Sequence, residues 1–277
     1  MDHLDILIKL AIEEDVGEGD ITSLATIPAN LRAKAEIRAK QDLIISGLEA
    51  ARRVFAAIDR SVSWKTVLRE GDRCNKGDVI ALLEGSARSL LEGERTSLNF
   101  LQHLSGIATQ ARLYADAVKG TNAKVLDTRK TIPCFRSLEK QAVKSSGCEN
   151  HRMGLYDHFL IKNNHITAAG SITTALERAK AARKTGQKIE IETRTIDDVK
   201  EALAGGADVI MLDNMSVDQV RDEVAVVKGK ALLEVSGNIN LENIRAYAET
   251  GVDFISVGAI THSAPAADIH MLILLGN

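Results

Sequence analysis

The sequence predicts an α/β fold in which an N-terminal α+β domain precedes a TIM-like, incomplete α/β barrel. Two observations about the second half of the chain lead to this prediction. From about residue 122 onward, short apolar strands alternate with helical segments, which indicates parallel strands joined by right-handed crossovers. The positions Glu192, Asp213, Ser236 and Gly258 also follow one another at a near-constant step of 21 to 23 residues.

Six strands are evident in this second half, with helical segments such as SITTALERAKAARKT between most of them. Their sequences are KVLDT, HFLIK, KIEIE, VIMLD, ALLEV and FISVG. Six strands could close into a barrel or leave an open, doubly wound sheet. We favour the barrel because polar residues stand at the C-terminal end of every strand, where a barrel places its active site.

The first 112 residues have a mixed pattern. The segment MDHLDILIKLAIEEDV has an apolar stripe typical of an amphipathic helix, and AKAEIRAKQDLIISG alternates as a strand does. A long helical segment follows from Ser86, with a break expected around Gly106. We therefore expect an N-terminal α+β domain over residues 1–112 and a catalytic barrel over 113–277, although the C-terminal residues could return to the first domain.

The bulk properties narrow the class of protein. With 45% hydrophobic and 26% charged residues, the composition is that of a soluble globular protein. A net charge of −3 argues against a broad basic face for nucleic acid. No apolar run approaches the roughly 18 residues of a membrane span, and the N-terminal segment is too acidic for a secretory or transit peptide. We expect a cytoplasmic protein that binds neither nucleic acid nor membrane.

A cluster of cations beside predicted strand ends or turns is the most informative feature. The segments DTRKT, NHRMGL and FLIKNNH contribute Arg129, Lys130, His151, Arg152 and Lys162 within about forty residues. Such a cluster suits a compact polyanion, because arginine can hold a carboxylate through two parallel hydrogen bonds. Read singly, His151 is more typical of a hydrogen-bonded structural histidine; Arg152 beside it favours a site.

Two carboxylates end consecutive predicted strands. Glu192 closes KIEIE and Asp213 closes VIMLD, and Glu190 is a weaker candidate on the same side of its strand. Magnesium binds few protein carboxylates and completes its octahedron with water and substrate phosphates, so the pair predicts a metal-phosphate partner. Alternatively, one carboxylate could cap the following helix, since TRTIDDVKEAL and NMSVDQV both begin helices.

Seven motifs follow one another on these strand ends: DTRKT, NHRMGL, LIKNNH, IEIET, MLDN, EVSGNI and SVGAITHS. Together with GEGDITS and GERTSLNFLQHLSGIAT, they resemble the quinolinate phosphoribosyltransferase family over essentially the whole chain. The resemblance implies that quinolinate and phosphoribosyl pyrophosphate condense with magnesium as cofactor, giving nicotinate mononucleotide, pyrophosphate and carbon dioxide in NAD biosynthesis. The sequence departs from the family's usual pattern at Cys134 and Asn238, where glycine is common, and at Ser146 and Cys148, which stand in a run that is usually rich in glycine.

The resemblance also implies a role for each candidate residue. Quinolinate would contact Arg129, His151, Arg152 and Lys162, while Arg95 would reach in from the second subunit of a homodimer that could assemble further. Without the resemblance, Arg95 would be interpreted as an ordinary surface arginine of a helix. Lys130, Glu192 and Asp213 would be catalytic, and both carboxylates would hold magnesium, partly through water. These three would also bind phosphoribosyl pyrophosphate, together with the last two loops, through Ser236, Gly237, Asn238, Gly258, Ala259 and His262.

Three other functions remain open at this point. A paralogue could take another substrate, such as nicotinate, although a cation cluster of dicarboxylate size argues against it. A Schiff-base aldolase could use Lys162 as its nucleophile, activated by cationic neighbours. A metabolite sensor could keep the barrel, but it would not need both metal carboxylates and pyrophosphate cations.

Overall fold

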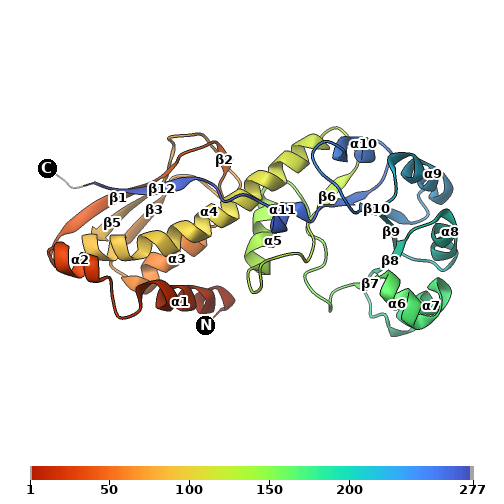
Figure 1. Ribbon diagram of the computed structural model, residues 1–277, viewed down its shortest axis with the longest axis horizontal. Coiled ribbons are helices and arrows are strands. Elements are labelled where there is room, and N and C mark those ends of the chain that lie inside the picture. Colours follow the sequence, from red (N-terminus) through yellow and green to blue (C-terminus); the bar gives the residue numbers. More distant parts are fainter. Residues whose placement is uncertain (1, 275–277) are drawn as a thin grey trace. The chain divides into compact units, whose positions relative to one another are not determined.

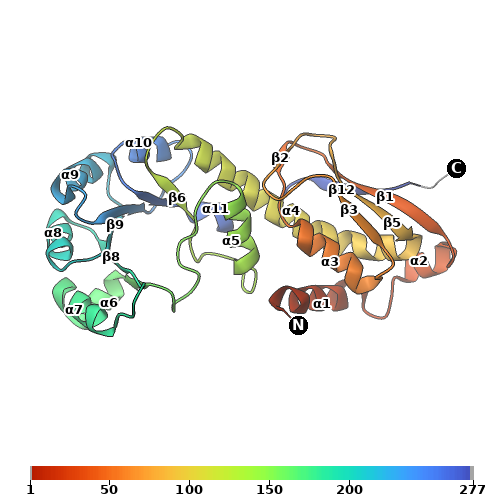
Figure 2. The same cartoon turned by 180° about the vertical axis from the view of Figure 1, so that it is seen from behind.

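The computed structural model describes residues 2–274 of the chain, which form two compact units (Figure 1, Figure 2). The barrel unit consists of Leu113–Ile132 and Gly147–Ser263. The N-terminal unit takes the residues up to Arg112, and it also takes Pro133–Ser146 and the residues from Ala264 on. A single division at residue 112 therefore does not describe the chain, because two later segments pack with the N-terminal unit.

The N-terminal unit combines helices with a four-stranded antiparallel sheet of order β12-β1-β5-β3 and a short β2-β4 pair. Its strands are β1 (Arg32–Ala39), β2 (Leu43–Ile44), β3 (Ser63–Thr66), β4 (Arg73–Cys74), β5 (Val79–Ser86) and β12 (Ile269–Leu274). Its helices are α1 (His3–Val16), α2 (Ile21–Thr26), α3 (Leu48–Ile58), α5 (Arg136–Ser145) and most of α4 (Ala87–Ala117).

The alternation of RAKAEIRA explains how this sheet packs. In β1 the apolar residues Ala33, Ala35 and Ile37 are buried, while the charged residues between them face away from the core. The buried face joins one apolar cluster with Phe55 of α3 and Leu101 of α4. Burial of such side chains drives the unit together, at about 25 cal/mol per Å² of apolar surface removed from water.

The predicted helix break at Gly106 was wrong, because α4 is continuous from Ala87 to Ala117. Gly106 instead allows a close approach of two backbone segments. A Cβ atom at this position would lie 2.1 Å from the carbonyl oxygen of Pro265, which belongs to the same unit. The glycine therefore serves packing between helix and backbone, where any side chain would collide.

We expect Gly106→Ala to destabilise the protein by about 1–3 kcal/mol, since the methyl group forces Pro265 away from α4. The sign of this change in stability is informative, because replacing glycine by alanine inside a helix otherwise stabilises the protein by roughly 0.5–1 kcal/mol. Urea unfolding measures the difference, and the exposed Asn99→Ala in the same helix is the matched control without a collision. A stabilised Gly106→Ala protein would contradict the packing role.

The barrel unit alternates strands and helices along most of its length. Its strands are β6 (Lys124–Leu126), β7 (Phe159–Ile161), β8 (Ile189–Thr193), β9 (Val209–Asp213), β10 (Leu232–Ser236) and β11 (Phe254–Ser256). Its helices are α6 (Asn163–Ala169), α7 (Ile172–Ala182), α8 (Ile196–Ala204), α9 (Val217–Val227), α10 (Ile244–Ala248) and α11 (Ala259–His262). All six predicted strands are confirmed.

The strand order confirms an incomplete TIM-like barrel. The six strands are parallel in the order β6-β11-β10-β9-β8-β7, so β7 to β11 follow the chain and the first strand pairs with the last. The ring stays open only between β6 and β7. An open doubly wound sheet would instead reverse its strand order at a switch point.

Strand alternation places polar side chains on the inner face of this curved sheet. The successive residues of β8 are all buried, as expected for parallel strands covered on both faces. Glu190 and Glu192 share one face of β8, and the register aligns Glu192 with Met211 of β9 and Asp213 with Ser236 of β10. The carboxyl ends of these strands therefore meet at one end of the barrel.

Among residues 2–274, no helix has the length and apolar character needed to cross a membrane.

Candidate functional site

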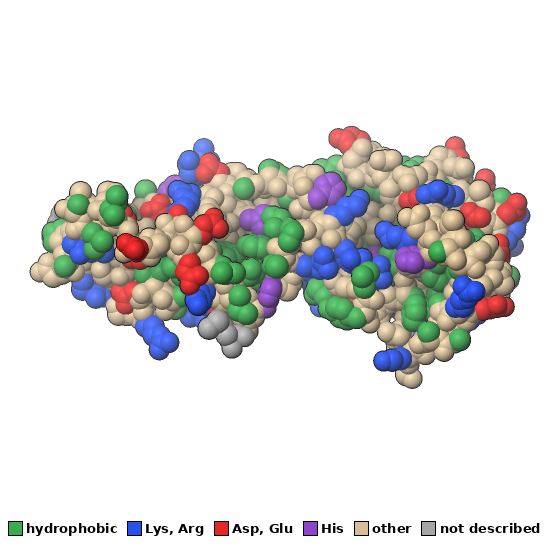
Figure 3. Space-filling view, turned by 60° about the horizontal axis from the view of Figure 1, so that its bottom comes forward, with side chains coloured by type: hydrophobic (Ala, Val, Ile, Leu, Met, Phe, Trp, Pro, Cys, Tyr) green, Lys and Arg blue, Asp and Glu red, His purple; other side chains and the backbone are tan. Residues whose placement is uncertain are grey.

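A cavity of about 720 Å³ opens at the carboxyl ends of the barrel strands. Lys and Arg side chains gather around this hollow in the barrel unit (Figure 3). Every candidate residue from the sequence lines the cavity except Arg95 and the weaker candidate Glu190. These lining candidates are Arg129, Lys130, His151, Arg152, Lys162, Glu192, Asp213, Ser236, Gly237, Asn238, Gly258, Ala259 and His262. The structure thus brings together residues that are up to 133 positions apart, from Arg129 to His262.

Arg95 does not belong to this lining. It lies on α4 in the N-terminal unit, where its side chain is exposed. In a single chain, Arg95 is therefore a surface arginine, as its helical sequence context alone would suggest. The role that the resemblance implies for Arg95, through a second subunit, stays a prediction.

Buried Asp127 holds the segment that carries His151 and Arg152. Asp127 follows β6 and is fully buried. Its carboxylate accepts hydrogen bonds from the backbone N–H of His151 at 2.9 Å and from Nδ2 of Asn150 at 2.6 Å. A carboxylate that accepts two hydrogen bonds in the interior is stabilised as the anion. The first residue of DTRKT is therefore structural, and it positions the cations that follow.

Arg152 is a buried cation whose guanidinium group is only partly hydrogen-bonded. Only 7% of the residue is exposed, and one guanidinium nitrogen donates to the carbonyl oxygen of His158 at 3.1 Å. Within residues 2–274, its Nε has no hydrogen-bond partner. Burial lowers the pKa of the guanidinium, and the nearby charge of Arg129 acts in the same direction. A buried N–H without a partner is costly, so this site favours an anionic ligand.

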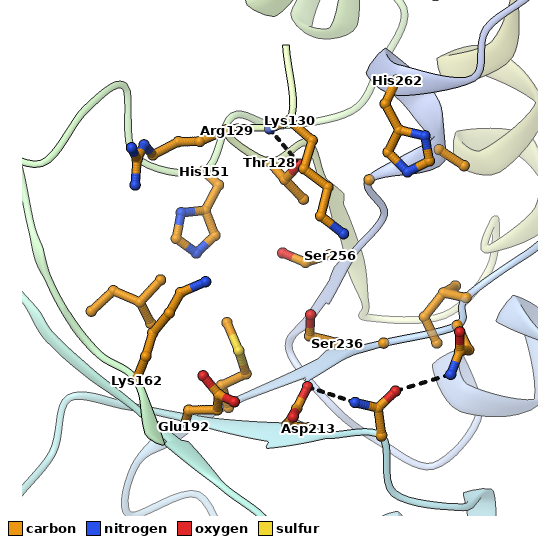
Figure 4. A pocket seen from close by; sticks show the side chains of 18 of the residues that line it. Thr128, Arg129, Lys130, His151, Lys162, Glu192, Asp213, Ser236, Ser256 and His262 are labelled. Carbon is orange, nitrogen blue, oxygen red and sulfur yellow. Dashed lines mark hydrogen bonds between the residues drawn. The ribbon is translucent and has the colours of Figure 1, made fainter. Parts of the chain in front are cut away.

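Two lysines extend into the cavity from different elements (Figure 4). Lys130 comes from the loop after β6, where its carbonyl oxygen accepts a hydrogen bond from the Thr261 hydroxyl at 2.7 Å. Lys162 directly follows β7 and stands at the N-terminus of α6. Together with Arg129 and Arg152, they give the cavity lining a positive charge that matches a compact polyanion.

Glu192 and Asp213 form a carboxylate pair on the neighbouring strands β8 and β9 (Figure 4). Burial raises the pKa of Glu192, and the charge of Asp213 acts in the same direction. Neither carboxylate caps the next helix: Thr195 caps α8 and Ser216 caps α9 through their hydroxyl groups. The capping alternative was therefore wrong, because hydroxyl residues nearer to each helix take that role.

The carboxylate pair has the chemistry that a magnesium ion requires. Two oxygen donors at adjacent strand ends face a cavity large enough for phosphate groups and water. Nearby donors restrain both side chains: Asn163 donates to Glu192, and Arg194 lies 3.8 Å from Glu192 and 3.7 Å from Asp213. The residues present therefore fit a divalent cation that also binds substrate oxygens.

A polar chain links Asp213 to the loop after β10 (Figure 4). Nδ2 of Asn214 donates to Asp213 at 3.0 Å, and Nδ2 of Asn238 donates to Asn214 at 3.0 Å. Gly237 and Asn238 both have left-handed backbones, with φ of 100° and 52°. Asparagine tolerates this conformation, so Asn238 keeps the loop shape at a position where glycine is common in the resembled family.

Sequence reasoning missed several residues that line the cavity. Thr128, Asn214 and Ser256 belong to it, as do the apolar residues Leu160, Met211 and Ile239. Thr128 and Asn214 directly neighbour predicted residues, and their positions at strand ends could have indicated them. Glu234, which lies deeper in the barrel, was also missed; alternation from Ser236 in LLEVS could have placed it on the inner face.

Comparisons with known proteins give one consistent answer. Residues 20–105 match the model of the quinolinate phosphoribosyl transferase N-terminal domain, and residues 107–272 match that of the C-terminal domain. The chain is 43% identical over 279 aligned positions to a probable nicotinate-nucleotide pyrophosphorylase (carboxylating) of Bacillus subtilis, covering 100% of this chain and 96% of that protein. It is 41% identical to a chloroplastic nicotinate-nucleotide pyrophosphorylase (carboxylating) of Arabidopsis thaliana, covering 98% of this chain and 82% of that protein.

A similar solved structure is NadC from Streptococcus pyogenes, with a TM-score of 0.95 and 38% sequence identity. The likeness covers 99% of this chain and 97% of that one. Both units of the chain therefore have counterparts in one known protein.

Proposed function

Because the chain belongs to the quinolinate phosphoribosyl transferase family, we propose that it joins quinolinate to phosphoribosyl pyrophosphate, giving nicotinate mononucleotide, pyrophosphate and carbon dioxide. The observation that carries the proposal is the cavity itself, whose lining combines buried Arg152 and other cations with the carboxylate pair Glu192 and Asp213. The cations suit a dicarboxylate, and the carboxylate pair suits a metal-bound diphosphate.

Quinolinate binds on the cationic side of the cavity in this proposal. Its two carboxylates take hydrogen bonds and charge from Arg129, Arg152 and Lys162, with His151 beside them. The unpartnered Nε of Arg152 supports this assignment, because an anion would satisfy a buried donor that no described residue satisfies. A nicotinate monoanion would leave part of this charge uncompensated, which favours the dicarboxylate as substrate.

Phosphoribosyl pyrophosphate occupies the other side of the cavity. Its 5-phosphate lies against the backbone of the last two loops, where Gly237 and Gly258 let amide groups approach an anion. His262 lines the same region. The pyrophosphate lies near Lys130, and the ribose hydroxyls lie toward Glu192 and Asp213.

The reaction needs positioning and charge stabilisation more than proton transfer. The pyridine nitrogen attacks the anomeric carbon while the bond to pyrophosphate breaks through an oxocarbenium-like state. Lys130 stabilises the negative charge that develops on the departing pyrophosphate. The new ring nitrogen is cationic, so the electron pair of the breaking carbon–carboxylate bond stays on the ring as carbon dioxide leaves, and that ring carbon then takes up a proton.

Glu192 and Asp213 are the residues that would hold magnesium, partly through water. When bound, the ion supplies positive charge that neutralises the pyrophosphate. The two carboxylates would fix the position of the ion. Each stands near the end of a buried strand, so the barrel sets the geometry of both.

We extend the proposal to a cytoplasmic homodimer, which could assemble further, with Arg95 of each subunit completing the active site of the other. Support for the shared site comes from the exposed Arg95 on α4, in the motif GERTSLNFLQHLSGIAT, and from its absence from the cavity lining of its own chain.

An assay of the purified protein with quinolinate, phosphoribosyl pyrophosphate and magnesium tests the proposal. We expect nicotinate mononucleotide and carbon dioxide in equal amounts, and no product when a chelator removes the metal. Nicotinate in place of quinolinate is the control and should give no product. Turnover of nicotinate without turnover of quinolinate would refute the proposed substrate.

A further inference from the structure

Three ionisable side chains converge at the base of the cavity: His151 of the proposed quinolinate site, and two glutamates, Glu190 and Glu234, that the proposed reaction does not use. Nε2 of His151 lies 3.1 Å from Oε2 of Glu190 and 3.7 Å from Oε2 of Glu234. One ligand atom from each of the three residues lies within 4.8 Å of the others. Glu190 and Glu234 are 6% and 1% exposed, and only His151 reaches the cavity lining.

The hydrogen bonds determine where the ring of His151 carries its proton. The backbone N–H of Arg152 donates to Nδ1 of His151 at 2.7 Å. A backbone N–H can only donate, so Nδ1 is the unprotonated nitrogen and Nε2 carries the hydrogen. Nε2–H then points to Glu190, which accepts it. Glu190 is also attracted by the positive charge of Arg152.

Glu234 has less compensation for a negative charge than Glu190. Oε1 of each carboxylate has no hydrogen-bond partner within residues 2–274, but the imidazole proton is directed to Glu190, and the charge of Arg152 attracts Glu190 as well. Two buried carboxylates at one nitrogen cannot both be ionised without a large cost. Burial raises the pKa of Glu234 to about 8, the charge of Glu190 acts in the same direction, and His151 and Ser256 partly oppose them.

We propose that Glu190 and Glu234 are positioning residues of the dicarboxylate site: Glu190 accepts the Nε2–H of His151 and orients its ring, and Glu234 keeps its proton at neutral pH so that the site can accept a dianion. The groups that act on Glu234 come from three elements, Glu190 from β8, His151 from the segment after β6, and Ser256 from β11. An ionised Glu234 would add a negative charge directly under the ligand.

This arrangement couples ligand binding to one proton. A bound dianion disfavours ionisation of Glu234, so the complex retains a proton that the free protein loses as the pH rises through about 8. The affinity for the dianion is therefore constant below that pH. Above it the affinity falls, and the decrease approaches tenfold for each further pH unit. In this ligand-dependent part the inference rests on the proposed function.

The protonation itself can be measured without any ligand. Infrared difference spectra of the wild type against Glu234→Gln at pH 7 should contain the carbonyl band of a protonated carboxyl group. The exposed Glu242→Gln is the matched control and should show only a carboxylate difference. In ¹⁵N-histidine-labelled protein, with His151 assigned through His151→Gln, the Nε2–H tautomer should be present in the wild type and in Glu234→Gln. In Glu190→Leu the tautomer should remain, because the backbone N–H of Arg152 still donates to Nδ1, but the Nε2–H signal should shift because that hydrogen has lost its acceptor.

The coupling between ligand binding and the proton of Glu234 is tested by calorimetric titration with pyridine-2,3-dicarboxylate between pH 6 and 9.5. A chelator is present, and the titrations are repeated in buffers of different ionisation enthalpy. The wild type and Glu242→Gln should lose affinity above pH 8 with net proton uptake, whereas Glu234→Gln should lack both effects. Absence of the protonated band, or an identical pH profile in Glu234→Gln, would overturn the inference. So would loss of the His151 Nε2–H signal on adding stoichiometric Zn²⁺, because a metal in the trio would displace that hydrogen and requires both carboxylates to be ionised. If the dicarboxylate does not bind at any pH, the proposed function fails, while the spectra still decide the state of Glu234.

Discussion

Replacing Arg152 with lysine is expected to reduce kcat/KM for quinolinate by about 100-fold or more, chiefly by raising KM. The guanidinium is buried, donates to His158 and keeps one donor directed to no described residue. Lysine preserves the charge but replaces a planar fork of donors by a single ammonium group, so parallel hydrogen bonds to a carboxylate are lost. Initial rates at varied quinolinate and saturating phosphoribosyl pyrophosphate measure the change.

The matched control is Arg221→Lys, which makes the same substitution on an exposed face of α9 where Arg221 pairs with Asp218. This variant should keep wild-type kinetics and change stability by less than about 0.5 kcal/mol. The melting temperature of Arg152→Lys must also be recorded, to separate loss of binding from unfolding. A wild-type KM in a folded Arg152→Lys protein would remove Arg152 from the quinolinate site.

Mixing two inactive variants should restore activity if the site is shared between subunits. Arg95→Ala and Arg129→Ala should each be nearly inactive alone. In a homodimer with two-fold symmetry, a mixed dimer has one site with both changes and one site with none. Random exchange of equal amounts makes half of the dimers mixed, each with one of two sites intact, so activity should recover to about a quarter of the wild-type value.

The control for this experiment mixes Arg129→Ala with Lys130→Ala, two residues that line the same cavity of one chain. Every active site then carries at least one change, so no recovery is expected. Exchange itself must be followed independently, for example by mass spectrometry of differently labelled subunits. If exchange is complete and the Arg95 mixture stays inactive, the shared site is excluded.

Much of the barrel could be predicted from the sequence, because its strands are short apolar runs with polar residues at their ends. The same pattern placed Lys162, Glu192 and Asp213 correctly at strand ends, since parallel strands bring their carboxyl ends to one side. The left-handed backbone at Cys134 and Asn238 could also be predicted, because both residues stand where glycine is common in the family.

Other features depend on contacts that no local pattern contains. Gly106 has the sequence signature of a helix break, but its neighbour Pro265 is 159 positions away along the chain. Glu190 and Glu234 become a linked pair only when two non-adjacent strands curve around His151. The segment around α5 could not be assigned to the N-terminal unit either, because stacking of Phe135 on Phe100 at 5.5 Å joins distant parts of the chain.

The pairing of β12 with β1 has a consequence for how the protein is made. Their nearest paired residues, Ala39 and Ile269, are 230 positions apart, so β1 has an unpaired edge throughout synthesis of the barrel. Open strand edges invite pairing with other chains. The barrel segments are complete before β12 is translated, so the barrel can fold while the N-terminal sheet still waits for its last strand. Removing Ile269–Leu274 would therefore damage the unit that begins the chain and leave the strands around the cavity intact.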